Sequence, residues 1–410
     1  MAAEEQDVES LEMVELREEV RAWIQQNRPP KPEFLEPENF MFVETNRQFE
    51  YLLEWQRKLF EAGYLGMEWP AEYGGGGRPT GSQNVVAREL SVARTPALVN
   101  IIGLQWAGPV ILQYGTEAQK LRLLKPMLSA EEIWCQGFSE PGSGSDLASA
   151  STFAESKGER QGWTVNGHKV WTTLGQFSKW MILLARSDKS APQYEGLSFF
   201  LAPMDVAGGD VQPLVKITGE GGFNQVIFTD AAVPQDALLG KLGQGWEVAM
   251  ATLTFERGAA EGTGAGNGGT VPSIRVSEVA ELAKRAQRNG SPAAQDAVFR
   301  DRASELWITE TALKIAAPRS RVPGLVADRP NALPLMTKAA GSENSQNLMD
   351  LACQALGPDA ALWLGDAGAP DEAIWPHAYL NSFASTIGGG TSQIQRNILG
   401  ERVLGLPKSK

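Results

Sequence analysis

The chain has 410 residues, of which 42% are apolar and 21% are charged, a composition typical of a folded globular protein. Its 49 acidic and 37 basic residues give a net charge of −12, which argues against nucleic acid as a partner. The longest apolar run, residues 180–185, is much shorter than the roughly 20 residues that cross a bilayer, so we expect no membrane span.

The cysteine and histidine content and the N-terminal residues limit the possible metal sites and the cellular compartment. Two cysteines and two histidines give neither a disulfide framework nor a cluster of metal-binding histidines, so we expect no bound metal. The first ten residues are acidic and polar, and they lack the basic and apolar parts of a secretory signal. We therefore expect a cytoplasmic protein.

The first third of the chain shows apolar residues at helical spacing and no strand pattern. A run of glycines at residues 74–77 breaks the periodicity between the second and third helical segments. The pattern predicts an N-terminal α-helical domain over residues 1–132. The predicted helices cover residues 13–23, 47–62, 82–93 and 116–129.

Near residue 133 the pattern changes to short segments rich in β-branched and aromatic residues. Turn residues bound these segments, and Asn166-Gly167 is typical of a hairpin turn. We expect a middle antiparallel β domain over residues 133–238, built as a sandwich or a barrel. The predicted strands cover residues 162–165, 169–172, 180–184, 197–201 and 225–228.

From residue 243 the helical period returns, which predicts a C-terminal α-helical bundle over residues 239–410 and an α+β fold overall. Six of the twelve residues 258–269 are glycine, which indicates a flexible break after the first of these helices. The predicted helices cover residues 246–257, 274–288, 293–316, 334–356 and 392–402.

Two apparent motifs carry little weight. Residues 264–269 match the dinucleotide-binding pattern G-x-G-x-x-G, but they follow a helix instead of a strand, so a connector is the better interpretation. His168 lies next to the predicted hairpin turn, where an exposed turn residue is expected, and no nucleophile elbow accompanies it.

Three other segments carry more specific patterns. The first, residues 136–146, reads QGFSEPGSGSD and is dense in hydroxyls, main-chain donors and small residues, which let a flat polar ring approach the backbone. The second, residues 166–173, reads NGHKVWTT, and the third, residues 388–398, reads GGGTSQIQRNI. Together with residues 401–407, these segments resemble the acyl-CoA dehydrogenase family, and the resemblance covers nearly the whole chain.

The resemblance implies FAD as the cofactor, with its ring between the β domain and the C-terminal helices. Trp171 would cover one face of the flavin, the alternative being an ordinary place in the β-domain core. Thr391 would cap the last helix, whose N-terminus would receive a phosphate of FAD. The residues that match FAD contacts of the family are Gln136, Phe138, Ser139, Gly144, Ser145, Trp171, Thr172, Thr173, Arg275, Gln354, Gly357, Thr391 and Gln393.

The family reaction removes an α-proton from an acyl-CoA thioester and passes a hydride from Cβ to the flavin. In many members the base is a carboxylate directly before the Gly-Thr-Ser of the closing loop, where this chain has Gly389. Some branches carry the base on the first helix after the β domain, and Glu256-Arg257 stands there. The resemblance thus implies Glu256 as the catalytic base, although the residue pattern alone also allows a structural ion pair with Arg257.

On helical spacing, Glu256 lies over Ala249 and Thr252, at the inner edge of an amphipathic helix. A carboxylate that is partly removed from water binds a proton more readily, which suits a base. The resemblance places Ser145, Arg257, Gly389 and Gly390 at the substrate, with the Gly389 amide helping to hold the thioester carbonyl. The glycine run removes side-chain volume, which would admit branched or ring-bearing acyl groups.

The resemblance also implies partners beyond the acyl-CoA substrate, namely electron-transfer flavoprotein or a similar acceptor, and a place in lipid catabolism such as β-oxidation. Family members are commonly homotetramers, so we expect a homo-oligomer, with a dimer or a hetero-oligomer as alternatives. Only Arg275 is a plausible contact to the FAD of a neighbouring subunit in residues 271–276. Two other interpretations stay open: a flavoprotein of this fold without base-dependent oxidation, and a structural subunit of a hetero-oligomeric dehydrogenase.

Overall fold

The computed structural model describes residues 10–37, 39–158, 161–256, 274–288, 290–316, 319 and 332–408. The chain divides into two compact units, Met1–Lys216 with Glu220–Gly268, and Ile217–Gly219 with Gly269–Lys410. Arg257 and the glycine-rich run at 258–269, which includes the G-x-G-x-x-G pattern, lie outside the described residues.

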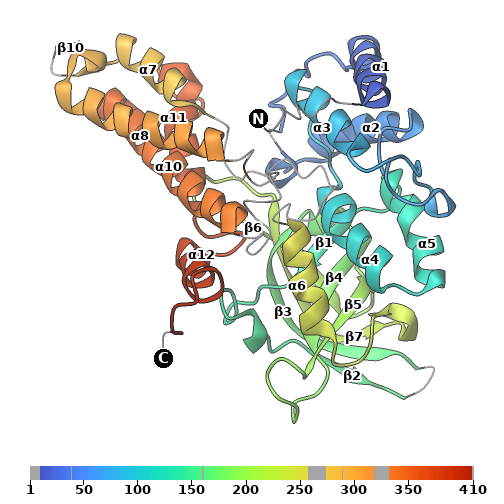
Figure 1. Cartoon of the computed structure of the whole chain (residues 1–410). Helices are drawn as coiled ribbons and strands as arrows, with labels where there is room; N and C mark the ends of the chain where they lie inside the picture. The colour runs from blue at the N-terminus through green and yellow to red at the C-terminus, as the bar shows by residue number, and fades with distance from the viewer. Residues whose placement is uncertain are drawn as a thin grey trace, which may run out of the picture. The chain divides into compact units, whose positions relative to one another are not determined.

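The first unit begins with helices (Figure 1), and α1, α2 and α5 among them start at side-chain caps. Ser10 accepts from the Met13 amide, while Thr45 and Thr116 form capping boxes with the glutamines three residues later. All four predicted helices are confirmed, and a π-helical segment, Ile102–Ala107, leads into a further helix that the periodicity did not reveal. The helices are α1 (Leu11–Asn27), α2 (Asn46–Glu61), α3 (Ser82–Val92), α4 (Gly108–Tyr114) and α5 (Glu117–Leu128).

The predicted β domain is confirmed as one largely antiparallel sheet in the order β6-β7-β3-β2-β4-β5-β8, with β1 parallel to β4. Every residue of β5, and all of β4 except Arg186, is buried, because apolar clusters cover both faces of these strands. The strands are β1 (Trp134–Gly137), β2 (Phe153–Ser156), β3 (Trp163–Thr173), β4 (Trp180–Arg186), β5 (Leu197–Pro203), β6 (Gly209–Leu214), β7 (Phe223–Val233) and β8 (Leu238–Leu239).

The prediction of a hairpin turn at Asn166-Gly167 is wrong, because both residues lie inside the long strand β3. The strand opposite, β7, has one extra residue there, and Asp230 takes a left-handed conformation with φ of 49°. Asn166 holds this bulge by accepting from the Asp230 amide at 2.9 Å. His168 is therefore not an exposed turn residue; it is half-buried and contacts Gln225 through a 2.7 Å hydrogen bond.

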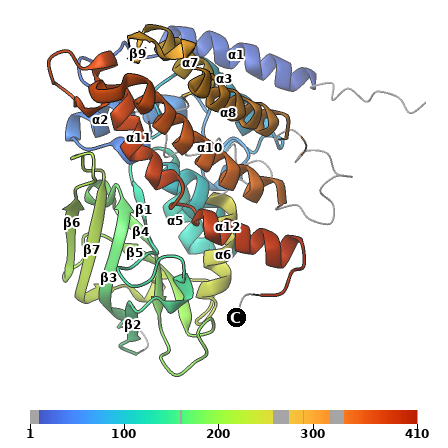
Figure 2. The ribbon, with the colours of Figure 1, turned by 90° about the vertical axis from the view of Figure 1, so that its left-hand side faces the viewer.

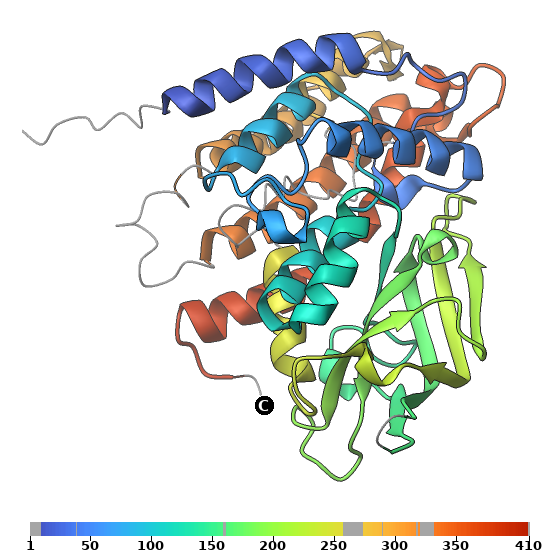
Figure 3. The ribbon, with the colours of Figure 1, turned by 90° about the vertical axis from the view of Figure 1, so that its right-hand side faces the viewer.

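After the sheet, α6 (Gly245–Glu256) packs back against β5, α4 and the π-helical segment, as Figure 3 shows for the same unit. Val248, Ala249 and Thr252 are fully buried on its inner face. The helix that carries the predicted base is thus part of the same core as the sheet.

The second unit is a helical bundle around α10, which contacts α7, α8, α11 and α12 (Figure 2). Its core joins Leu348, Met349 and Ala352 of α10 to Trp375 and Ala378 of α11. The predicted helix over 274–288 ends earlier, at Arg285, because the chain then forms the short hairpin β9 (Gln287–Arg288) and β10 (Ser291–Pro292). The helices are α7 (Val276–Arg285), α8 (Ala297–Ala316), α10 (Ala332–Leu356), α11 (Ile374–Ser385) and α12 (Ser392–Ile398).

No helix within the described ranges is both long enough and apolar enough to cross a membrane.

Candidate functional site

The segment at residues 136–146 leaves β1 and folds into a tight turn. Glu140 and Ser143 exchange two main-chain hydrogen bonds, of 2.9 and 3.1 Å, and the Ser143 hydroxyl donates to the Asp146 carbonyl at 2.7 Å. Gly144 and Ser145 lie exposed on this turn. Both predicted contact residues therefore present main-chain and hydroxyl groups at the surface of the first unit.

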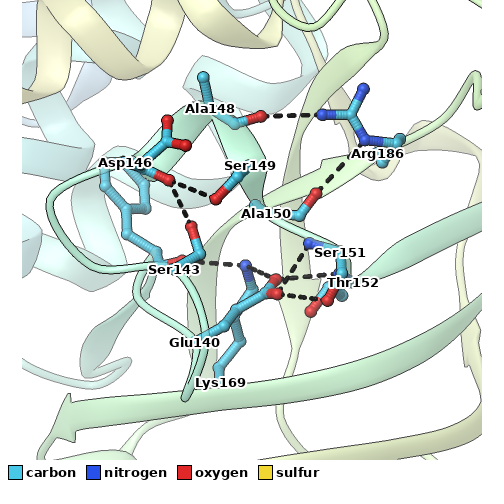
Figure 4. A network of polar contacts seen from close by, with 11 residues as sticks. Glu140, Ser143, Asp146, Ala148, Ser149, Ala150, Ser151, Thr152, Lys169 and Arg186 are labelled. Carbon is cyan, nitrogen blue, oxygen red and sulfur yellow. Dashed lines mark hydrogen bonds and ion pairs between the residues drawn. The ribbon is translucent and has the colours of Figure 1, made fainter.

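A buried ion pair holds this turn against β3 (Figure 4). The Glu140 carboxylate accepts from Lys169 Nζ at 2.8 Å, from the amide and hydroxyl of Ser151 at 2.7 Å each, and from the Thr152 amide at 2.9 Å. Burial pushes the pKa of Glu140 upward, but the charge of Lys169 and these hydrogen bonds outweigh it and lower the pKa to about 2. Burial lowers the pKa of Lys169 to about 8, although Glu140 pulls it upward. The pair is therefore ionised at neutral pH.

The same lysine reaches the main chain of the predicted flavin segment. Lys169 Nζ donates to the Phe138 carbonyl at 3.0 Å, and the Val170 amide donates to the Ser139 carbonyl at 2.9 Å. The Phe138 ring is buried edge-on against Phe199. The sequence places Lys169 and Glu140 inside two recognised segments, but no periodic pattern signals that residues 29 positions apart form a buried pair.

Trp171 lies on a bulge of β3, where three steps along β3 (Lys169 to Thr172) match two steps along β7. Its φ is 60°, a left-handed conformation that is uncommon for a bulky residue. Trp171 as a whole is 61% exposed, and its indole rests edge-on against Phe223, with ring centroids 5.9 Å apart. Trp171 is therefore not part of the β-domain core, and the bulge turns its indole toward the surface.

Buried polar atoms near the ends of β1 and β3 fit a polar ligand. Thr172 is fully buried, and its hydroxyl has no hydrogen-bond partner among the described residues. The same holds for Gln136 Nε2. Leaving such a group unpaired costs about 1–3 kcal/mol, so a ligand that bonds it would recover that energy. Thr173 follows in the strand and is 7% exposed. These residues are compatible with the predicted flavin ring.

Glu256 is the last described residue of α6 and is half-buried. Thr252 and Ala249, one and two turns earlier, are fully buried, so the prediction that this face of α6 points inward is confirmed. The carboxylate thus stands where a buried helix face reaches the end of the helix. Its predicted neighbour Arg257 lies outside the described residues.

In the second unit, the glycine run joins α11 to α12. Gly389 and Gly390 have φ of 64° and 91°, conformations that favour glycine. Gln395 Nε2 donates to the Gly389 carbonyl at 2.8 Å, and Lys338 Nζ donates to the Gly390 carbonyl. Contacts from α10 and α12 therefore fix the path of this loop.

Thr391 caps α12 as predicted, since its hydroxyl accepts from the Ile394 amide at 3.2 Å. Gln393 is exposed and lines a shallow pocket together with Thr391 and Glu343. Glu343 also forms a two-fold ion pair with Arg396, at 2.7 Å for each bond. The predicted contacts Thr391 and Gln393 therefore share one surface of the second unit.

Arg275, Gln354 and Gly357 lie elsewhere in the second unit. Arg275 is exposed at the start of α7, where its amide donates to Glu278 at 2.8 Å. The Gln354 side chain is held at both ends, by Arg302 at 2.6 Å and by Asp350 at 2.8 Å. Gly357 has φ of 60° and follows the last residue of α10, as a helix-ending glycine does.

Within the described residues, no group of three histidine, cysteine or carboxylate side chains is arranged to hold a metal ion.

Comparison with known proteins identifies matches along nearly the whole chain. Residues 10–131 match the acyl-CoA dehydrogenase N-terminal domain, residues 135–231 the middle domain and residues 243–404 the C-terminal domain. Acyl-CoA dehydrogenase IpdE1 of Mycobacterium tuberculosis is 38% identical over 404 residues, which is 98% of this chain and 99% of that protein.

Two solved structures share the fold. The Tcur3481-Tcur3483 steroid ACAD has a TM-score of 0.75 and 25% sequence identity, and the match covers 98% of this chain and 99% of that one. The ChsE4-ChsE5 complex of Mycobacterium tuberculosis has a TM-score of 0.73 and 24% identity, with coverage of 98% and 99%.

Proposed function

Because this chain belongs to the acyl-CoA dehydrogenase family, we propose that it catalyses the FAD-dependent α,β-dehydrogenation of an acyl-CoA thioester. The observation that carries the proposal is Trp171, a residue that is 61% exposed and that lies on a strand bulge with a left-handed backbone. A stacked aromatic ring would bury much of this surface, which gives a reason for a conformation that is otherwise costly.

FAD, when bound, would accept the hydride that leaves the substrate Cβ. Residues of the first unit would hold its ring: Trp171 against one face, and Gln136, Phe138, Ser139, Gly144, Ser145, Thr172 and Thr173 around its polar atoms. The rest of the cofactor would be bound by residues of the second unit, namely Thr391, Gln393, Arg275, Gln354 and Gly357. The exposed Trp171 supports this assignment most directly.

Glu256 would remove the substrate α-proton onto its carboxylate. A general base of this kind contributes typically 10²–10⁴-fold to the rate. Gly389 cannot supply a carboxylate, so no second base is expected at the closing loop. Its main-chain amide, which needs no side chain, would instead donate to the thioester carbonyl and stabilise the charge that develops there. Ser145, Arg257 and Gly390 complete the proposed substrate contacts.

The proposed acyl group is bulky and bears a ring. Residues 388–390 are three successive glycines, so the loop carries no side chain at Gly389, the position proposed to face the substrate. The similar solved structure is named a steroid ACAD, which favours a polycyclic acyl group over a straight chain.

The purified protein tests this function in two steps. A flavin absorbance spectrum is expected first, and then bleaching of that flavin under anaerobic conditions by a polycyclic acyl-CoA more than by short or long straight-chain ones. Glu256→Gln should abolish the bleaching and leave acyl-CoA binding nearly intact, since the amide keeps the size but cannot take the proton. Glu247→Gln, the same change near the start of α6, is the matched control and should bleach normally. If Glu256→Gln still bleaches its flavin at a near-native rate, Glu256 is not the catalytic base.

Electrons would then pass to electron-transfer flavoprotein or a similar acceptor, and the chain would act as a homo-oligomer. A second candidate is a subunit of a hetero-oligomeric dehydrogenase, favoured by the paired names of the two similar structures. Size-exclusion chromatography of the chain expressed alone separates the two. A yellow dimer or tetramer supports the homo-oligomer, and a colourless protein that gains flavin only with a second chain supports the alternative.

A further inference from the structure

The buried pair of Glu140 and Lys169 takes no part in the chemistry proposed above, yet its two residues lie in the two segments assigned to the flavin. The side chains are 4% and 0% exposed. Removing charges from water costs several kcal/mol per ion, and an apolar pair of similar volume is often equally stable or more so. A contribution to stability therefore does not explain why two charges are buried here.

What this pair does, and an apolar pair would not, is to bind the main chain. Lys169 Nζ donates to the Phe138 carbonyl at 3.0 Å. Because the peptide group is planar and trans, the Ser139 amide points away from that carbonyl and hence away from Lys169. None of the described residues accepts a hydrogen bond from this amide. The Ser139 amide is thereby left as a donor for an acceptor from outside the chain.

The pair also links this donor to the exposed indole. The residue after Lys169, Val170, donates its amide to the Ser139 carbonyl at 2.9 Å, so β3 holds Ser139 on both sides. The bulge that turns Trp171 outward begins at this point of the strand. The Glu140 carboxylate, with its three bonds from Ser151 and Thr152, keeps the ammonium of Lys169 in place (Figure 4).

We propose that Glu140 and Lys169 are positioning residues, which fix the Ser139 amide relative to the Trp171 indole and so set the affinity for the flavin ring. The inference rests on the proposed function, because it takes FAD as the ligand of this segment. It assigns a role to two residues that touch no reacting atom.

The double variant Lys169→Met/Glu140→Gln tests the inference. Both charges leave together, so neither is left buried alone. The new amide oxygen can still accept from the amide and hydroxyl of Ser151, whereas the bond from the Thr152 amide, which goes to the other carboxylate oxygen, is lost. We expect the variant to fold, to bind FAD at least tenfold more weakly in a titration of the apoprotein, and to show faster hydrogen exchange at residues 136–146. The control Lys179→Met/Asp205→Asn removes an exposed ion pair of the same unit and should change neither quantity.

Glu140→Asp is a second variant in case the double variant does not fold. It keeps both charges but withdraws the carboxylate by one methylene, and it should weaken FAD binding severalfold. FAD affinity within twofold of the wild type in either folded variant would overturn the inference, and so would unchanged exchange at residues 136–146. If the wild type itself binds no FAD, the proposed function fails, and the exchange experiment on the apoprotein still decides whether the pair orders the segment.

Discussion

The two regions proposed to hold the cofactor are fixed in opposite ways. In the first unit, the turn at residues 136–146 is held by a lysine and a glutamate that are almost fully buried. In the second unit, the loop at residues 386–391 is held by half-buried Lys338, by Gln395, and by an ion pair of α10 and α12 whose arginine is 57% exposed.

The difference decides how each region responds to change. A buried charge that loses its partner has no water to replace it, so the arrangement in the first unit is kept whole or lost. Water can replace a contact of a half-exposed charge, so the loop in the second unit tolerates the loss of one partner. The first region suits a cofactor ring of constant shape, and the second suits contacts that vary with the substrate.

The largest expected effect is on the free energy of unfolding, and it appears when one lysine of each region is replaced in a separate variant. Lys169→Met leaves Glu140 buried without its cation and should lower the free energy of unfolding by about 3–5 kcal/mol. Lys338→Met removes a hydrogen bond from a half-buried ammonium and should cost about 1–2 kcal/mol. Urea unfolding of the two apoproteins, followed by circular dichroism, measures both. Equal losses would mean that burial does not distinguish the two regions.

Acid should weaken the first region next. The folded-state pKa of Glu140, about 2, lies below the ordinary 4.5. Its contribution to stability is therefore fully present above about pH 4.5 and is lost as the pH falls toward 2, because the unfolded chain takes up the proton first. In Glu140→Gln this loss should be absent, so its stability should fall less between pH 4.5 and 2 than that of the wild type. Parallel pH profiles for the two proteins, from thermal melts, would contradict the assignment.

Loss of the indole should affect binding and leave folding unchanged. Trp171→Ala removes a ring that is mostly exposed and should leave the melting temperature of the apoprotein within a few degrees of the wild type. Stacking on an aromatic side chain is worth about 1–3 kcal/mol, so FAD affinity should fall about five- to 150-fold. A fluorescence titration with FAD measures the loss, and Trp163→Phe, a change at a buried tryptophan of the same strand, is the control. Native FAD affinity in Trp171→Ala would show that the ring binds elsewhere.

Sequence periodicity predicted most helices and the extent of the sheet, because amphipathic spacing and β-branched runs are local signals. It did not predict α11, whose first turn contains Pro376 and follows three residues with positive φ. Helices tolerate proline in the first turn, but the proline itself is usually taken as a break. Asn166-Gly167 misled the prediction because its position opposite a bulge depends on β7, some 60 residues later.

The sequence identified the segments that form the candidate site, but it did not predict the contacts between them. Thr391 was placed correctly at a helix cap, since a cap depends on neighbours within a few residues. The exposure of Trp171 was not predicted, because it depends on a bulge against β7, a strand far along the chain. Glu140 and Lys169 were visible as letters, but their burial and pairing depend on how two segments meet in three dimensions. The same applies to Lys338, which reaches a carbonyl 52 positions along the chain.

The smallest expected effect is a difference in stability between alanine variants of two neighbouring glycines of the loop. Gly389 has φ of 64°, where a side chain costs about 1–2 kcal/mol, so Gly389→Ala should destabilise the protein by about 1 kcal/mol. Gly388 lies outside the left-handed region, and a methyl group there would meet the Ala384 carbonyl only at 3.4 Å. Gly388→Ala should therefore be neutral or stabilising by up to about 1 kcal/mol, because it restricts the unfolded chain.

The pair also tests the role proposed for the loop. Gly389→Ala keeps the main-chain amide, so its rate of flavin reduction should fall far less than that of Glu256→Gln. Gly389→Asn accepts a left-handed backbone at lower cost and should recover part of the stability, yet it adds volume and should weaken binding of a bulky acyl-CoA. Urea unfolding of Gly388→Ala, Gly389→Ala, Gly389→Asn and Glu256→Gln measures the cost of backbone strain. Stopped-flow flavin reduction of the same variants measures the effect of added side-chain volume on the reaction. If Gly388→Ala proves as damaging as Gly389→Ala, the left-handed turn is not what sets the path of the loop, and its amide has no assigned place at the thioester.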